Sequence, residues 1–214
     1  QRQMCIRDRI GPGSRAFYAK GLREIAVRSI DADREIEVPK ALIVPFGLMK
    51  ATHFVLPVEV PSDHVGLLYV DGVFERQLAP GRYAFIRAVH RVDSVILVLR
   101  LQTLEVTGQE VLTRDRIGLR ANPTAVYRIA DPAVVVSVAA DLRDHLHKAL
   151  QFALRQVIGT RTLEEVLGDK QGINAAIAEH LAGDLAETGV EVPSVGVKDI
   201  ILPGDVRELM NRVI

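Results

Sequence analysis

The 214-residue sequence has no tryptophan, and its aromatic content is only 5%. Proteins that bind sugars or bases commonly stack them on aromatic rings, so this scarcity disfavours a stacking cleft. Cys5 is the single cysteine, which excludes an intrachain disulfide, and the sequence has no CxxC or Cys/His cluster of the kind that binds structural zinc. The lack of disulfides mildly favours a reducing compartment.

The chain also has no excess of positively or negatively charged residues. Lys plus Arg and Asp plus Glu both total 27, so the formal net charge is zero. The chain therefore has no long-range positive field with which to gather nucleic acid or anionic lipid, and we expect no nucleic-acid partner. Hydrophobic residues make up 48% of the chain, which is ordinary for a globular protein and sufficient for a sizeable core.

The sequence contains no pattern that would carry catalysis. No serine lies in a Gly-x-Ser-x-Gly elbow, Ser194 falls in a strand-like run, and no glycine-rich turn leads into a Lys-Ser/Thr pair. On one helix His145 and His147 would point about 200° apart and could not share an ion. We interpret their segment as a solvated face on which Asp144 pairs with His147 or Lys148. We expect no enzyme, no cofactor and no metal site.

The beginning of the chain divides into two segments. Residues 1–9, QRQMCIRDR, resemble translated sequencing-adapter sequence, and we expect an artefact or a disordered segment there. For residues 10–63 we expect a short helix and linker followed by an apolar segment close to a membrane. No charged n-region followed by an apolar run predicts a signal peptide. The abrupt start leads us to expect that the sequence is truncated.

The apolar segment runs from Ala41 to Val58, with Lys50 as its sole formal charge. Pro45, Gly47 and Pro57 interrupt it, and a spanning helix needs about 20 predominantly apolar residues. A regular transmembrane helix is therefore not expected. The segment is either a buried strand or loop packed on the domain, or a short interfacial or re-entrant hairpin.

From His64 onward, short apolar runs separated by turn signals predict antiparallel strands. Asp71-Gly72 suits a two-residue turn with positive φ, and Pro80-Gly81 suits a type II turn. Residues 109–129 continue this pattern, with apolar side chains alternating onto one face.

The pattern becomes helical after residue 130. Asp131 is expected to cap a helix with Pro132 in its first turn. Apolar residues at spacings of three and four predict a long helix over residues 141–159, with Asp141 as its N-cap and Gly159 as C′.

Further helices and a final strand complete the pattern. Thr162 and Glu165 form a capping box that opens a short helix, and another helix over residues 173–185 ends before Gly189. Residues 190–202 return to strand. Because strands come first and helices later, we predict an α+β fold, with antiparallel strands followed by helices packed on the sheet.

Five segments, taken in order, resemble the SPFH (stomatin, prohibitin, flotillin) or band 7 domain, and its prokaryotic slipin branch in particular. They are GLLYVDGVFERQLAPGRYAF, LQTLEVTGQEVLTRDRIGL, YRIADP, LQFALRQVIGTRTLEEVL and GVEVPSVGVKDIILP. The resemblance places the SPFH domain at residues 64–203. Departures are Thr188, where relatives often carry an aromatic residue, and Asn122-Pro123, which we expect to interrupt a strand.

The resemblance implies a non-catalytic scaffold that lies at a membrane, assembles with itself into large oligomers, and regulates membrane proteins such as proteases and channels. It implies membrane lipid as a partner and, in the slipin branch, a membrane-bound serine protease. It also favours the bacterial inner membrane as the location. Two alternatives remain open: a soluble adaptor of a membrane-bound protease without large assembly, and a small hydrolase whose site the sequence does not show.

The end of the chain, VKDIILPGDVRELMNRVI, is where we expect oligomerisation. After the Pro203-Gly204 break, residues 204–214 predict an amphipathic helix that leads toward a coiled coil. No residue closes this helix, so we expect the sequence to be truncated here too. A helix folded back on its own domain is the alternative. The candidate oligomerisation residues are Val197, Asp199, Ile200, Val206, Leu209, Met210 and Val213.

Overall fold

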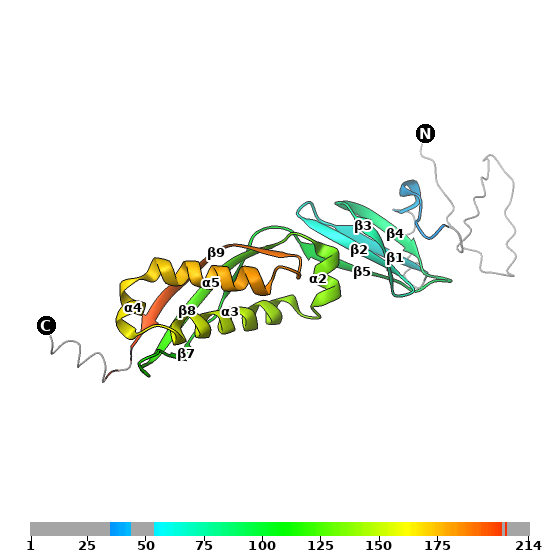
Figure 1. Cartoon of the computed structure of the whole chain (residues 1–214). Coiled ribbons are helices and arrows are strands. Elements are labelled where there is room, and N and C mark those ends of the chain that lie inside the picture. Colours follow the sequence, from blue (N-terminus) through cyan, green and yellow to red (C-terminus); the bar gives the residue numbers. More distant parts are fainter. Residues whose placement is uncertain (1–34, 44–53, 203, 205–214) are drawn as a thin grey trace, which may run out of the picture. The chain divides into compact units, whose positions relative to one another are not determined.

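A computed structural model describes residues 35–43, 54–202 and 204 of the chain. Over residues 54–202, antiparallel strands come first, helices follow and a last strand returns, so the predicted α+β class is confirmed (Figure 1). The chain divides into two compact units, residues 1–96 and 97–214. The predictions made for residues 1–9 and for the helix after residue 204 lie outside the described residues.

The first unit is built from strands alone over residues 54–96. β1 pairs with β4, and β3, β2 and β5 form a second sheet in that order, all antiparallel where the register is given. Val55 and Val58, at the end of the apolar segment, are buried in β1, and Tyr83 stacks on the fully buried Phe85. The strands are β1 (Val55–Val60), β2 (His64–Val70), β3 (Val73–Leu78), β4 (Gly81–Ile86) and β5 (Val92–Val98).

Of the two turns predicted for this unit, one is confirmed and the other is wrong. Asp71 and Gly72 have φ of 51° and 83°, as predicted for the two-residue turn between β2 and β3. The type II turn predicted at Pro80-Gly81 is wrong. Gly81 has φ of 155° and pairs with Val60, so it already belongs to β4, whereas a type II turn needs φ near +80°.

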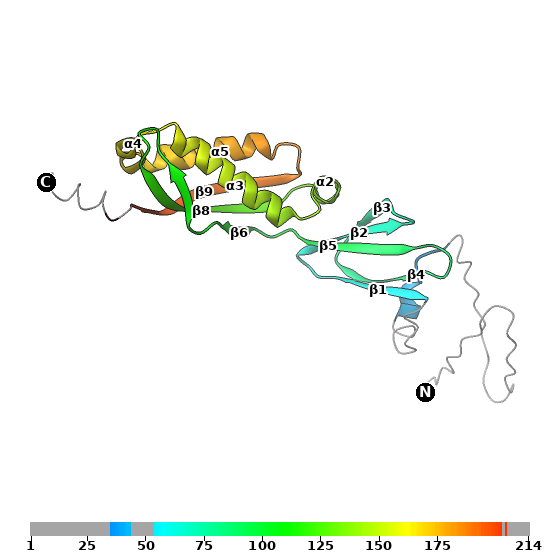
Figure 2. The ribbon, with the colours of Figure 1, turned by 90° about the horizontal axis from the view of Figure 1, so that it is seen from below.

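The second unit contains a sheet centred on β8, with β6 and β7 along one edge and β9 along the other (Figure 2). All of these pairings are antiparallel. The strands are β6 (Gln102–Glu105), β7 (Gln109–Leu112), β8 (Gly118–Ile129) and β9 (Val190–Ile201).

The interruption predicted at Asn122-Pro123 is an irregularity and not a break: β8 runs through both residues, but its pairing with β9 shifts register between Ala121 and Pro123. The backbone N–H of Val106 donates to the Pro123 carbonyl at 3.0 Å, and that of Gly108 donates to Asn122 Oδ1 at 2.7 Å. Both contacts come from residues 106–108, which link β6 to β7, so regular strand pairing on that side of β8 is already interrupted here. A proline is tolerated at such a place because no strand bond is lost there.

Helices α3 and α5 cover one face of this sheet (Figure 1). The fully buried side chains of the two helices lie at the predicted spacings. Complete burial of one such side chain stabilises the fold by roughly 1.5–3 kcal/mol. The helices are α2 (Pro132–Val138), α3 (Leu142–Gly159), α4 (Leu163–Gly168) and α5 (Lys170–Asp184).

The predicted helix starts are confirmed. Asp131 Oδ1 accepts hydrogen bonds from the backbone N–H groups of the first turn of α2, with Pro132 at the start of that helix. Asp141 caps α3, and Thr162 and Glu165 form the reciprocal capping box of α4. These side chains satisfy donors that have no partner within the helix.

The predicted end of the long helix is wrong by one residue. Gly159 does not adopt a left-handed C′ conformation but is the last residue of α3, and Thr160 follows as the C-cap with φ of −91°. The Thr160 hydroxyl donates to the carbonyl of Val157 at 3.0 Å. A side chain therefore satisfies the helix end, and positive φ is not needed there.

Candidate functional site

The predicted oligomerisation residues fall partly on β9. Val197 and Ile200 are half-buried and pack against the core, whereas Asp199 is exposed. The backbone N–H of Val197 donates to Asn174 Oδ1 on α5 at 2.9 Å, so part of the outer edge of β9 already has a partner. The predicted residues Val206, Leu209, Met210 and Val213 lie outside the described residues.

The face of the sheet opposite α3 and α5 bears polar side chains and cross-strand ion pairs. Two of the ion pairs join residues paired on neighbouring antiparallel strands, whereas Glu105 on β6 reaches Lys198 on β9 across β8. Their side chains are all more than one-third exposed, so each pair contributes only about 0–1 kcal/mol. The pairs are Glu110–Arg120 (2.7 Å), Arg128–Glu191 (2.6 Å) and Glu105–Lys198 (3.1 Å).

An apolar groove of about 580 Å³ interrupts this polar face at the end of β9. Leu112 on β7 and Ile201 on β9 expose 63% and 53% of their surface. Leu112 pairs with Gly118, which has no side chain and so leaves a hollow beside it. The groove is lined by Glu110, Val111, Leu112, Gly118, Leu119, Arg120, Ile201 and Leu202.

Sequence reasoning missed this groove, although its signal is present. Glu110 and Leu112 both lie on the outer face of β7, and Leu112 places an apolar side chain where a polar one is expected. Ile200, Ile201 and Leu202 are consecutive apolar residues, which puts apolar groups on both faces of the strand end. Apolar residues on both faces of an edge strand indicate a second contact surface.

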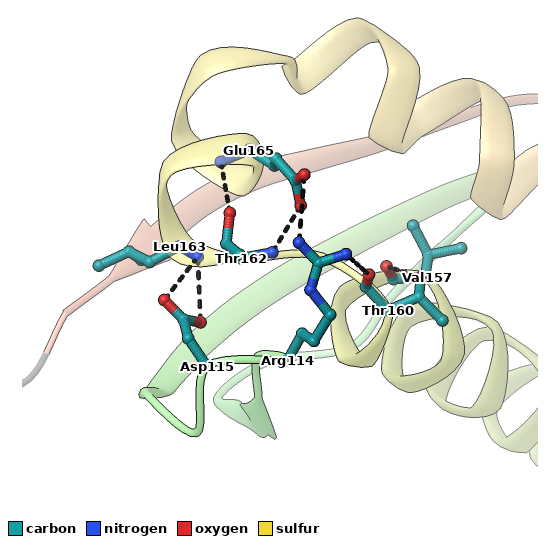
Figure 3. Close-up of polar contacts among 7 residues, drawn as sticks. All are labelled: Arg114, Asp115, Val157, Thr160, Thr162, Leu163 and Glu165. Carbon is teal, nitrogen blue, oxygen red and sulfur yellow. Dashed lines mark hydrogen bonds and ion pairs between the residues drawn. The ribbon is translucent and has the colours of Figure 1, made fainter.

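The turn between β7 and β8 is fastened to the corner between α3 and α4 (Figure 3). The Asp115 carboxylate accepts a hydrogen bond from the backbone N–H of Leu163 at 3.2 Å, and the Arg114 backbone N–H donates to the Arg161 carbonyl at 2.8 Å. Arg114 also contacts Glu165 at 3.4 Å. These contacts hold the end of β7, and therefore Leu112, in place beside the groove.

Hydrogen bonds lower the pKa values of two carboxyl groups at this corner. A hydrogen bond from the Thr113 side chain, reinforced by the Leu163 N–H, holds the pKa of Asp115 below its ordinary value. The backbone N–H of Thr162 does the same to the pKa of Glu165. Both groups therefore remain ionised at neutral pH as helix-capping acceptors.

Three further observations concern ion pairing, metal binding and membrane-spanning helices in the described residues. As predicted, Asp144 pairs with Lys148, at 2.7 Å on α3. In residues 35–43 and 54–202, no group of His, Cys, Asp or Glu side chains has a metal-binding arrangement. Within the same part of the chain, no helix is both long and apolar enough to cross a membrane.

Comparison with known proteins identifies relatives over half to two-thirds of the chain. An uncharacterised protein of Archaeoglobus fulgidus is 29% identical over 145 residues, which cover 68% of this chain and 57% of that protein. A stomatin homolog of Pyrococcus horikoshii is 30% identical over 119 residues, covering 56% and 45%. Stomatin-3 of Caenorhabditis elegans is 32% identical over 112 residues, covering 52% and 42%.

The chain therefore spans about half the length of these relatives. The family described as SPFH domain / Band 7 matches residues 58–214, which is well over half of the chain and includes both the β-strand unit and the sheet with its helices. The predicted resemblance is confirmed at the level of the family, and the chain belongs to the SPFH domain / Band 7 family.

Proposed function

We propose that this chain is a non-catalytic, membrane-associated scaffold subunit that assembles with copies of itself into large oligomers. The observation that carries the proposal is the apolar groove around Leu112 and Ile201. Exposed apolar side chains gathered in a hollow favour a protein partner, because their contact with that partner removes apolar surface from water. The stomatin-like relatives support the membrane association of the scaffold.

The occupant that we propose for the groove is the C-terminal segment of a second copy. Leu202 lines the groove, and residues 205–214 follow it almost directly in the sequence. At helical spacing the apolar residues of that segment would form one stripe. These residues are Val206, Leu209, Met210 and Val213.

Charge also fits this contact. The sequence DVRELMNRVI carries two acidic and two basic residues, and the acidic and basic residues of the groove, Glu110 and Arg120, are paired with each other. Docking of the apolar stripe therefore brings no uncompensated charge into the contact, which would otherwise oppose binding.

In this proposal the assembled scaffold regulates neighbouring membrane proteins such as proteases and channels. Support comes from the resemblance to the slipin branch, for which a membrane-bound serine protease is the expected partner. A prokaryotic source and a bacterial inner membrane remain our predictions.

The test is the mass of the particle in solution. Light scattering of the 214-residue chain at micromolar concentration should give a large oligomer, and Ile201→Asp should reduce its mass because a carboxylate would enter the apolar contact. The matched control is Phe152→Asp on α3, another exposed apolar residue, which should leave the mass unchanged.

The assembly proposal would be overturned if both the unsubstituted chain and Ile201→Asp were monomeric, with and without phosphatidylcholine vesicles. If that monomer still floats with vesicles, the soluble-adaptor alternative is excluded but large assembly is not supported. If Ile201→Asp and Phe152→Asp reduced the mass of the particle equally, the groove would have no special role in assembly.

A further inference from the structure

The turn between β7 and β8 contains an arginine in a left-handed backbone conformation. Arg116 has φ of 64°, which glycine and asparagine adopt far more readily than a residue with a long side chain. The backbone N–H of Arg116 donates to the Thr113 carbonyl at 2.9 Å, and that of Ile117 donates to Thr113 Oγ1 at 3.0 Å. These contacts would hold a glycine in the same shape, so the turn itself does not need the arginine side chain. A residue kept in this conformation at a cost indicates a role for its side chain.

The charge of Arg116 has no partner in the part of the chain that the structure describes. The other two charged residues of the turn point toward α4 (Figure 3). Arg114 contacts Glu165 at 3.4 Å, and the Asp115 carboxylate accepts the backbone N–H of Leu163 at 3.2 Å. Arg116 is exposed, and among the described residues no ion pair engages its guanidinium. The turn therefore presents a cation that is free to bind a group from outside.

This cation lies at the margin of the apolar groove. Leu112 and Gly118, which stand on either side of the turn in the sequence, both line the groove. Two residues of chain span at most about 7 Å, so the Cα atom of Arg116 lies no farther than that from the Cα atom of Gly118. The charged residues that line the groove, Glu110 and Arg120, are paired with each other. A carboxylate on the occupant of the groove is therefore the group that would complement Arg116.

We propose that Arg116 determines how the groove is occupied, by binding the carboxylate of Asp205 in the C-terminal segment of another copy. This inference rests on the proposed function and adds to it a residue that fixes the direction of the docked segment. At helical spacing Asp205 lies about 90° from the centre of the apolar stripe of that segment, whereas Glu208 lies about 150° from it. With the stripe in the groove, Asp205 is at the margin of the contact and Glu208 faces away. The segment should therefore dock with its first residues beside the turn between β7 and β8.

Two opposite charge reversals, placed in separate chains, test this pairing. Arg116→Glu and Asp205→Arg should each raise the concentration at which half of the chain is assembled, by roughly three- to tenfold, because like charges then meet at the margin of the groove. Light scattering over a dilution series measures this concentration. An equal mixture of the two variants should assemble like the unsubstituted chain, because each groove can then receive a segment of opposite charge. A pair formed within one chain would not be restored by mixing.

Arg116→Gly separates recognition from folding. Loss of the guanidinium should again raise the concentration at half-assembly. The urea midpoint should not fall, because relief of the left-handed backbone offsets the greater entropy of glycine in the unfolded chain. It is measured at a dilution at which the chain is dissociated, since assembly itself raises the midpoint. The matched control is Arg155→Glu, which reverses the charge of an exposed arginine on α3 and should leave the concentration at half-assembly unchanged.

The outcomes separate this inference from the proposed function. If the unsubstituted chain does not assemble, both fail. If it assembles and Arg116→Glu assembles equally well, the role of Arg116 is overturned and the proposed function stands. If both reversals weaken assembly, the mixture stays weak and one chain carrying both reversals is restored, the pair forms within a chain and the inference is wrong. A urea midpoint that falls in Arg116→Gly would show that the side chain supports the fold, which also overturns the inference.

Discussion

Asp115 joins two parts of the second unit that are distant in the sequence. It lies in the turn between β7 and β8, yet its carboxylate accepts the backbone N–H of Leu163 at the start of α4. The neighbouring Arg116 has φ of 64°, a conformation that costs free energy for a residue with a side chain. The contact of Asp115 with α4, together with the contacts of Arg114, holds the turn in this shape and so helps to position the end of β7.

Asp115→Asn should lower the urea midpoint of unfolding at pH 7, because an amide oxygen accepts the Leu163 N–H without the charge of the carboxylate. Folding holds the pKa of Asp115 below its ordinary value of 3.8. Its stabilisation is therefore fully present above the pKa of the unfolded chain and is lost as the pH falls through the lower folded value.

The difference in midpoint between the unsubstituted chain and Asp115→Asn should accordingly shrink when the pH is lowered from 7 toward 3. The matched control is Asp184→Asn, an exposed carboxylate at the end of α5, which should leave the midpoint nearly unchanged. A difference that is constant from pH 7 to pH 3 would contradict the assigned role of the Asp115 charge.

At the scale of elements, the connection between α5 and β9 is fixed by a glycine. Gly189 has φ of 72°, and a Cβ there would lie 2.6 Å from the carbonyl oxygen of Asp131. The Gly189 carbonyl accepts hydrogen bonds from the N–H groups of Ala130 and Asp131 at 2.9 and 3.0 Å. The start of β9 is thereby fastened to the N-cap of α2.

Gly189→Ala should destabilise the fold by more than the roughly 1–2 kcal/mol that a left-handed backbone alone costs, because the new methyl group also meets a backbone atom. Gly183→Ala in α5 is the control, since nothing lies within 4 Å of its Cβ position. It should stabilise the helix by about 0.5–1 kcal/mol. Equal urea midpoints for the two variants would contradict this account of the turn.

The helices and most strands could be predicted because their signals are local. Asp131, Asp141 and Thr162 mark helix starts through contacts made within a few residues, and the spacing of Ile173 and Ile177 reports burial directly. The error at the end of α3 arises because two local signals compete there. Gly159 is not a C′ residue because the Thr160 hydroxyl satisfies the helix end, and sequence alone favours the glycine.

The boundary between the two units could not be predicted. It falls between Ile96 and Leu97, inside the run RVDSVILVLRLQTLEV, which contains no glycine or proline to mark a break. The boundary lies within β5, where Val95, Ile96, Leu97 and Val98 follow one another without a break, so the sequence pattern continues through it. The groove was missed for a related reason, because Leu112 and Ile201 are brought together only by the pairing of both their strands with β8.

At the scale of the whole molecule, the apolar groove belongs to the second unit alone, because all of its lining residues lie between Glu110 and Leu202. Its exposed apolar side chains, Leu112 and Ile201, lie beside the ion pair of Glu110 and Arg120. The self-assembly that we propose is therefore assigned to the second unit.

The central claim, that the groove receives the C-terminal segment of another copy, is tested most directly by a disulfide between two chains. With Cys5→Ser as background, a chain carrying Leu112→Cys is mixed with a chain carrying Met210→Cys and oxidised. We predict a crosslinked heterodimer, and none when Phe152→Cys replaces Leu112→Cys. Failure of the mixed chains to crosslink, with an intrachain disulfide forming readily when one chain carries both Leu112→Cys and Met210→Cys, would contradict the account.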